Sequence, residues 1–209
     1  RNFGLSREGQ DNRMNISDFV DVLDDGMPHF DFIMFDACFM MSVEVAYEVR
    51  NYTDYYIGSP TENPGPGAPY DKVVPYMFKP GAAAQMAEAY FNHYKDNYKA
   101  GEGISNANWT GGTSICAVRT DALDDLADVT GQLLERADNE SVPSFNTVFD
   151  YDKRDMEEGH VGYYDFSQMM EMRLDADAYV AWKNVFDASI VYWNTTDKNY
   201  SMFKRMFSM

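Results

Sequence analysis

Cys38 is the residue of this sequence whose position most suggests chemistry. A cysteine thiolate is a nucleophile that can attack a carbonyl carbon. Cysteine is also among the most buried residue types, so by itself it more often only fills space in a core. Here it follows an apolar run and precedes a helical pattern, where the positive end of a helix dipole would favour the thiolate. Asp36, two positions earlier, points to the same side of an extended chain.

The elements around Cys38 predict an α/β unit. Residues 32–35 form an unbroken apolar run, which is typical of a strand buried on both faces in a parallel sheet. Apolar residues then recur at about every fourth position, which predicts a helix over residues 39–50 with one face on the sheet. Ligands of such sheets bind at the carboxyl ends of strands. The turn that holds Asp36 and Cys38 is therefore where a site is expected.

A second strand is predicted at residues 54–59, and it leads into a loop at residues 60–70 that is rich in proline and glycine. Neither a helix nor a sheet ladder can run through such a loop. A long ordered loop beside a strand end is more often functional than accidental, so we expect it to form one wall beside Cys38. Thr61 and Glu62 open this loop and could add to a pocket, but a solvated loop explains them equally well.

Residues 32–71 resemble the clostripain family of cysteine peptidases. That family shows Asp-Ala-Cys-Leu-Met after an apolar strand, then Glu-Val-Ala-Tyr on a helix, a serine-containing strand and a Pro/Gly loop. This sequence has Asp36-Ala37-Cys38, with Phe39 where leucine is usual, and later Glu44-Val45-Ala46-Tyr47 and Gly65-Pro66-Gly67-Ala68-Pro69-Tyr70. Outside these residues the resemblance is vaguer.

The resemblance implies a caspase-like three-layer α/β fold with a mainly parallel central sheet, and cleavage of peptide bonds after Arg or Lys. Cys38 would be the nucleophile, with a nearby backbone N–H in the oxyanion hole. Asp36 matches the family's acid in the substrate pocket, where two carboxylate oxygens meet the fork of a guanidinium. The alternative for Asp36 is a cap of the following helix. Thr61 and Glu62 would add to the same pocket.

The family pairs its cysteine with a histidine that precedes a glycine, and this histidine is missing. None of His29, His93 and His160 is followed by glycine. His29 lies at the beginning of the Cys38 strand, and about seven extended residues would hold the two side chains ~25 Å apart. Members of the family are often cut between the histidine and the cysteine. Since the sequence opens with Arg1, we expect a heavy chain whose light chain carries the histidine.

The charge of the chain excludes some classes of function. It has 17 Lys and Arg against 34 Asp and Glu, a formal charge of -17 over 209 residues. Such a surface repels phosphate backbones and anionic lipids, so we expect no nucleic acid partner. No apolar run approaches the ~20 residues of a membrane span. The resemblance implies a bacterial protein that is secreted, periplasmic or on the cell surface.

No metal or cofactor is expected from the residues. The cysteines have no zinc spacing, the histidines are too far apart, and the acidic pairs lack the pattern of an EF-hand loop. Some members of the family respond to calcium, which leaves a calcium requirement open. Cys116 lies in the middle of a predicted strand and is expected in the core, and both cysteines are expected to be reduced.

Two parts are predicted along the chain: a Cys-bearing caspase-like core at residues 1–138, and a largely helical or mixed extension at residues 139–209 that packs on the same core. The predicted elements are a helix at 16–23 capped by Ser17, a helix at 82–98, a strand at 114–118, a helix at 122–137 capped by Asp121, helices at 164–173 and 176–188, and a last strand at 190–193.

Three functions are compared. The first is a cysteine endopeptidase subunit that cleaves after Arg or Lys, with its histidine supplied by an upstream segment or light chain. The second is a caspase-fold binding or scaffold protein that keeps the cysteine without catalysis. The third, an acyl-transferring hydrolase with a nucleophile elbow, is disfavoured because bulky Phe39 and Met40 stand where that turn demands small residues.

Overall fold

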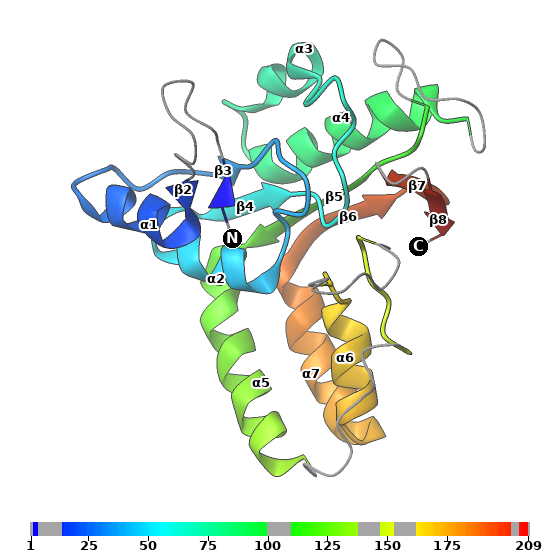
Figure 1. Cartoon of the computed structure of the whole chain (residues 1–209). Helices are drawn as coiled ribbons and strands as arrows, with labels where there is room; N and C mark the ends of the chain where they lie inside the picture. The colour runs from blue at the N-terminus through cyan, green and yellow to red at the C-terminus, as the bar shows by residue number, and fades with distance from the viewer. Residues whose placement is uncertain are drawn as a thin grey trace.

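The centre of the molecule is a four-stranded sheet in the order β3-β4-β5-β6 (Figure 1). The structure, a computed structural model, describes residues 2–3, 14–99, 110–137, 147–152, 162–201 and 205–208. The strands of the central sheet are β3 (Ile33–Met34), β4 (Tyr55–Gly58), β5 (Ser114–Arg119) and β6 (Ile190–Thr195). Helices cover both faces of this sheet, which gives three layers.

The helices divide between the two faces (Figure 1). They are α1 (Ile16–Asp24), α2 (Val43–Val49), α3 (Tyr70–Val73), α4 (Ala82–Asn97), α5 (Leu123–Arg136), α6 (Phe166–Arg173) and α7 (Ala176–Ser189), with short 3-10 turns η1 (Arg50–Tyr52), η2 (Val74–Tyr76) and η3 (Thr120–Ala122). Helix α4 covers one face, and α2, α5 and α7 cover the other. No helix in the ranges described combines the length and the apolar character that crossing a membrane requires.

The residues of the strands face two separate cores in alternation, as the period of an extended chain requires. Tyr56 and Cys116 point into the core beneath α2, α5 and α7. Their neighbours Ile57 and Ala117 point into the core beneath α4, and both are 0% exposed. A strand buried on both faces reads as a continuous apolar run, which fits residues 114–118. Residues 32–35 also alternate between the two cores, but they are only half-buried, because β3 is an edge strand of the described sheet.

The layered α/β architecture that the sequence predicts is confirmed, but the described sheet is mixed. Strand β3 runs parallel to β4, with Ile33 opposite Tyr56. Strand β5 is antiparallel to both β4 and β6. Strands β3, β4 and β6 therefore run in one direction, in agreement with a mainly parallel sheet, and β5 is the exception among the strands described. An apolar run reports burial on both faces and carries no information about strand direction, so the reversed β5 could not be predicted.

Two predicted helix caps were wrong. Helix α1 is capped by Asn15, whose backbone N–H donates to Asp18 at 2.9 Å, and Ser17 lies inside the helix. Asp121 does not cap α5. Its carboxylate instead binds the guanidinium of Arg119, with two N–O distances of 2.6 Å. In both cases a local polar neighbour was available that the helical spacing alone does not reveal.

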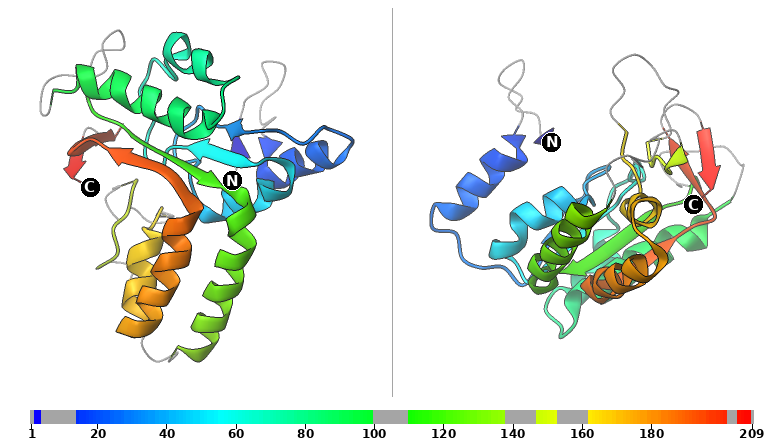
Figure 2. Two further views of the ribbon diagram at one scale, coloured as in Figure 1. Left: turned by 180° about the vertical axis from the view of Figure 1, so that it is seen from behind. Right: turned by 90° about the horizontal axis from the view of Figure 1, so that it is seen from below.

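The part of the chain after residue 138 completes the same core. Strand β6 pairs with β5, and Figure 2 shows α5, α6 and α7 together on one side of the sheet. Trp182 of α7 is 0% exposed and donates its indole N–H to Thr130 of α5 at 2.9 Å. The division into domains at residue 138 stays a prediction. Two small sheets, β1 (Asn2–Phe3) with β2 (Met14–Asn15) and β7 (Lys198–Ser201) with β8 (Arg205–Ser208), lie outside the central one.

Candidate active site

Asp36 and Cys38 lie where β3 leaves the sheet. The N–H of Phe35 still donates to the carbonyl of Ile57 at 3.0 Å, so the parallel pairing continues one step past β3. Beyond Phe35 the chain turns out of the sheet, and Cys38 is exposed. The sulfur is therefore not enclosed in packed hydrocarbon, which is a condition that a nucleophile must meet.

The turn after Cys38 is tight and costly. Phe39 has a φ of 57°, a left-handed conformation that costs a non-glycine residue about 1–2 kcal/mol. Its backbone N–H donates to the carbonyl of Thr61 at 2.9 Å, and its side chain is 8% exposed. Phe39 thus adopts a sharp turn despite its bulk, so its size does not exclude a nucleophile elbow at this residue.

Helix α2 begins later than the sequence predicts. Ser42 is its N-cap and accepts a hydrogen bond from the N–H of Val45 at 3.3 Å. Cys38 therefore stands before the cap and not at the first turn of the helix. Because the helix dipole acts within the first turn, its expected effect on the thiolate is weaker than predicted. The alternative role of Asp36 as the cap of this helix is also wrong.

The Pro/Gly loop forms a wall beside Cys38, as predicted. The backbone N–H of Asn63 donates to the sulfur of Cys38, with 3.2 Å between N and Sγ. The side-chain amide of Asn63 donates to Oδ1 of Asp36 at 3.1 Å. One residue of the loop thus contacts both the sulfur and the neighbouring carboxylate. No local pattern predicts these contacts of Asn63, because they join segments far apart in the chain.

The second oxygen of Asp36 is held from further along the same loop. Oδ2 accepts hydrogen bonds from the N–H of Ala68 at 2.8 Å and from the hydroxyl of Tyr70 at 3.3 Å. Gly67 has a φ of 78°, and a Cβ built on it would lie 2.9 Å from Oδ2. Both the backbone conformation and the space demand glycine there. The carboxylate is thereby fixed in direction while the residue as a whole stays exposed.

Thr61 and Glu62 lie at the beginning of this loop. Thr61 is 0% exposed, and its hydroxyl oxygen lies 2.7 Å from that of Ser114 and 3.1 Å from that of Ser59. These hydroxyls form a buried polar group between the end of β4 and the start of β5. Glu62 is half-buried beside Thr61. That either residue contacts a substrate stays a prediction.

Tyrosines surround Asp36 with neutral hydroxyl groups. Burial raises the pKa of Tyr94 to about 12, and the nearby charge of Asp36 adds to this. The pKa of Tyr70 is raised by the same two causes in the same order, with the hydrogen bond to Asp36 adding to them. Tyr94 donates its hydroxyl to the carbonyl of Gly67. Tyr94 is one of the buried residues of α4, and helical spacing alone does not reveal that its hydroxyl reaches the loop beside Asp36.

The histidines of the described chain lie in other settings. Nε2 of His29 is 2.8 Å from Oδ1 of Asp54, at the ends where β3 and β4 begin. This agrees with the expectation that His29 cannot reach Cys38 along one strand. The ring of His93, on α4, lies edge-on to that of Tyr94 with 4.9 Å between centroids. His160 lies outside the described residues.

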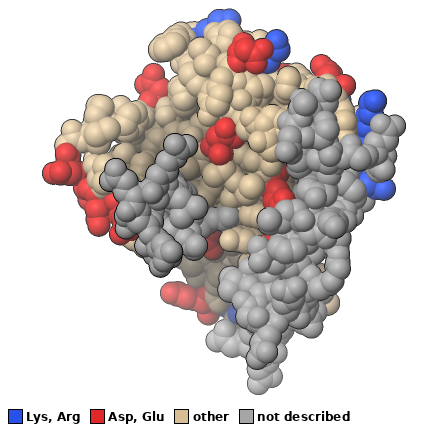
Figure 3. Space-filling view, turned by 45° about the horizontal axis from the view of Figure 1, so that its top comes forward, with Lys and Arg blue, Asp and Glu red and all other residues tan. Residues whose placement is uncertain are grey.

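The charge of the surface is unevenly distributed. Figure 3 shows acidic side chains at the edge over α1 and scattered across the rest of the visible face.

In the ranges that the structure describes, no group of three or more His, Cys, Asp or Glu side chains is placed to hold a metal ion. Cys38 and Cys116 are not joined in a disulfide. Cys116 is 7% exposed in the core, as predicted.

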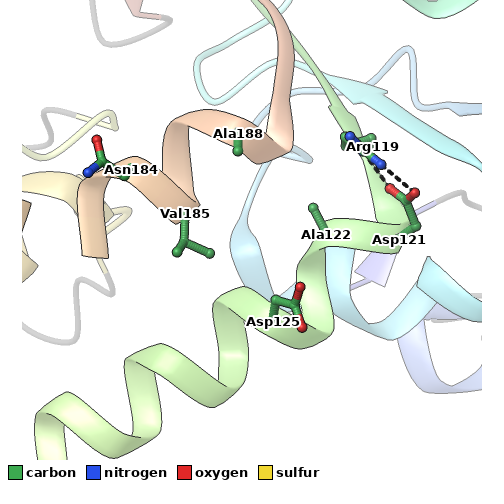
Figure 4. Close-up of a pocket in the computed structure, with 7 residues that line it drawn as sticks. All are labelled: Arg119, Asp121, Ala122, Asp125, Asn184, Val185 and Ala188. Carbon is green, nitrogen blue, oxygen red and sulfur yellow. Dashed lines mark hydrogen bonds and ion pairs between the residues drawn. The ribbon is translucent and has the colours of Figure 1, made fainter. Parts of the chain in front are cut away.

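A cavity of about 370 Å³ opens at the other end of β5, between α5 and α7 (Figure 4). Arg119 and Asp121 on its rim bind each other through two hydrogen bonds, and Asn184 and Val185 belong to its wall. Arg119 is opposite Tyr55, the first residue of β4, so this cavity lies away from Cys38 at the far edge of the sheet. Arg119 and Asp121 pair with each other, and the residues that line this cavity include no cysteine, serine or threonine.

Comparison with known proteins gives a consistent result. A model of the clostripain family matches residues 3–208. A cysteine protease from B. fragilis is 38% identical, with a TM-score of 0.88 over 99% of this chain and 83% of that one. A secreted C11 cysteine protease from Bacteroides thetaiotaomicron, solved with an irreversible peptide inhibitor, is 40% identical, with a TM-score of 0.85 over 99% of this chain and 57% of that one.

A third solved structure is more distant. It is an inactive zymogen of a C11 protease from Parabacteroides distasonis, 27% identical, with a TM-score of 0.77 over 94% of this chain and 54% of that one. The present chain thus spans little more than half the length of two of these three proteins. No curated protein sequence matches the chain.

Proposed function

Since this chain belongs to the clostripain family of cysteine peptidases, we propose that it is the nucleophile-bearing part of an endopeptidase that cleaves after Arg or Lys. The observation that carries the proposal is the exposed sulfur of Cys38 beside the fixed carboxylate of Asp36. An accessible thiol and an oriented acid on one turn are what such a reaction requires.

Cys38 acts as the nucleophile. Its thiolate attacks the scissile carbonyl carbon, the amine leaves with a proton from an imidazole, and water then hydrolyses the thioester. A backbone N–H close to Cys38 stabilises the oxyanion. The N–H of Phe39 already donates to Thr61, so another backbone donor takes this role unless that bond opens.

The imidazole comes from a segment outside this sequence. His29 is bound to Asp54 where β3 and β4 begin, away from the turn of Cys38. An upstream segment or a separate light chain supplies the histidine and is then a protein partner of this chain. The protein is secreted, as is the relative from Bacteroides thetaiotaomicron.

Asp36 binds the cationic side chain of the substrate. Its carboxylate is directed by Asn63, Ala68 and Tyr70, so it meets the ligand in a fixed orientation. Arg would approach with two parallel donors and Lys with a single ammonium group. Glu62 and the net charge of -17 add to the attraction of cationic substrates. Thr61 contributes by shaping the start of the loop.

The test uses the whole protein, including the segment that carries the histidine. Fluorogenic peptides with Arg, Lys, Leu or Glu before the scissile bond are compared for the wild type, Cys38→Ala and Asp36→Asn. We expect cleavage after Arg and Lys, no cleavage by Cys38→Ala, and a fall of about a hundredfold or more in kcat/KM for Asp36→Asn, because the charge of the ion pair is lost.

Three outcomes count against the proposal. Full activity after alkylation of Cys38 would refute its role as nucleophile. An unchanged preference for Arg and Lys in Asp36→Asn would refute the role of Asp36. Absence of any cleavage by the whole protein would favour a binding or scaffold function instead. The same assay with and without a chelator decides whether calcium is required.

A further inference from the structure

We propose that Asn63 is a positioning residue that couples the substrate-binding acid Asp36 to the sulfur of Cys38. The inference rests on the proposed function and assigns a role to a residue with no part in it so far. The backbone N of Asn63 is 3.2 Å from Sγ of Cys38, and its side-chain Nδ2 is 3.1 Å from Oδ1 of Asp36. A single residue therefore spans the distance between the two functional groups.

The side chain of Asn63 depends on Asp36 for its position. Its amide oxygen is buried and has no hydrogen-bond partner in the described part of the chain. The reversed amide would place that oxygen against the carboxylate of Asp36, so only the orientation with Nδ2 toward Oδ1 is favourable. The hydrogen bond from Nδ2 to Asp36 therefore forms although it leaves the buried Oδ1 of Asn63 without a partner in the described part of the chain. Removal of Oδ1 would release the side chain.

The backbone of Asn63 has little freedom to compensate. Asn63 precedes Pro64, which restricts it to extended conformations. Before it, the carbonyl of Thr61 is bound by the N–H of Phe39 at 2.9 Å, and after it the N–H of Gly67 closes a turn on the carbonyl of Pro64 at 2.9 Å. These restraints hold the loop on either side of Asn63, and the bond from its side chain to Asp36 adds the restraint nearest to the N–H that points at the sulfur.

This arrangement links substrate recognition to thiol reactivity. A hydrogen bond donated to sulfur favours the thiolate over the thiol, so the contact from Asn63 raises the nucleophilic fraction of Cys38. Each oxygen of Asp36 has two lone pairs. Oδ2 accepts two hydrogen bonds, from Ala68 and Tyr70, whereas Oδ1 accepts one, from the amide of Asn63. The oxygen that holds Asn63 is therefore also the one best placed to receive a substrate cation.

The test measures the rate at which iodoacetamide alkylates Cys38 in the whole protein at pH 7, with the modified peptide identified by mass spectrometry. We expect Asn63→Ala to lower this rate about three- to tenfold, the range for loss of one hydrogen bond to the thiolate. The matched control is Tyr70→Phe, which also removes a donor from Asp36 but has no bond to the sulfur, and its rate should stay within about twofold of the wild type.

Variants of Asp36 extend the test. Asp36→Asn keeps an oxygen that can accept from Asn63 and should alkylate at nearly the wild-type rate, whereas Asp36→Ala should match Asn63→Ala. The double variant Asp36→Ala/Asn63→Ala should be no slower than either single one, since both break the same link. Equal rates for Asn63→Ala and Tyr70→Phe, or additive losses in the double variant, would overturn the coupling.

Alkylation needs no peptidase activity, so the two proposals fail separately. Absence of cleavage would refute the proposed function and leave the alkylation rates to decide on Asn63. An active peptidase with an unchanged alkylation rate in Asn63→Ala would refute the coupling alone.

Discussion

The aromatic ring of Phe39 stacks on that of Tyr163, with 4.8 Å between the centroids and 9° between the planes. This contact joins the residue after Cys38 to the part of the chain after residue 138. Phe39 also holds the left-handed backbone conformation that turns the chain away from β3. The C-terminal part therefore contributes directly to the turn that presents the sulfur.

Replacement of Tyr163 by alanine tests this contribution. We expect Tyr163→Ala to lower the free energy of unfolding by about 1–2 kcal/mol, because the stacked pair and its buried area are lost. The alkylation rate of Cys38 should change as well, since the turn loses a support. Tyr163→Phe keeps the ring and serves as the control. Equal unfolding curves in urea for the two variants would show that the stacking does not stabilise the turn.

Gly67 gives a second prediction, because its missing side chain makes room for Asp36. Gly67→Ala should reduce stability by about 1–2 kcal/mol through its positive φ and should also displace the carboxylate, since the new Cβ would lie 2.9 Å from Oδ2. Gly26→Ala is a matched control with a φ of 86° and nothing within 4 Å of its Cβ.

The difference between the two glycine variants isolates the displacement of Asp36. Thermal unfolding should shift at least as much in Gly67→Ala as in Gly26→Ala, whereas kcat/KM for Arg and Lys peptides should fall about tenfold or more only in Gly67→Ala. Similar kinetics in the two variants would mean that the position of Asp36 is not set by the loop.

Thr61 provides a third prediction. Its buried hydroxyl shares hydrogen bonds with the hydroxyls of Ser59 and Ser114. Thr61→Val removes one hydrogen-bond partner from each serine and should lower the free energy of unfolding by about 1–3 kcal/mol. Thr61→Ser keeps the hydroxyl and should cost less. Both are measured by urea unfolding. We expect KM for cationic peptides to change little, and a large rise in KM for both variants at unchanged stability would instead place Thr61 in contact with the substrate.

The sequence allowed prediction of those features that depend on local period and composition. Asp36 and Cys38 could be placed at the end of a strand because the apolar run stops at Phe35. The loop beside Cys38 could be placed because proline and glycine exclude regular structure. Asn63 and Tyr163 could not be found this way, because each reaches the turn from a separate segment. The hydrogen bond and the ring contact that they make exist only after the chain has folded.

The direction of the strands and the first residue of α2 could not be predicted from the sequence for a related reason. Burial patterns are the same for parallel and antiparallel strands in a covered sheet, so the residues of β5 do not indicate that this strand is antiparallel to its neighbours. The apolar period seen from Met41 onward is also compatible with a helix that begins at Phe39. The cap by Ser42 and the left-handed Phe39 decide the actual boundary.

Cys116 leads to the last prediction, which concerns alkaline pH. It is 7% exposed in β5, and burial raises the pKa of its thiol from the ordinary 9.0 to about 12. The folded state therefore keeps a proton that the unfolded state releases. The stabilisation is fully present below pH 9 and is lost as the pH rises toward 12, by about 1.4 kcal/mol per pH unit.

The control is Cys116→Ala, which lacks the thiol but keeps every other titrating group. We expect the wild type to lose about 2 kcal/mol more than this variant between pH 8 and pH 10.5, as measured by urea unfolding at both values. In the native wild type at pH 8, iodoacetamide should modify Cys38 and spare Cys116, because the buried thiol is both protonated and inaccessible. Parallel losses of stability in the two proteins, or prompt alkylation of Cys116 without denaturant, would show that this thiol is not enclosed in the core.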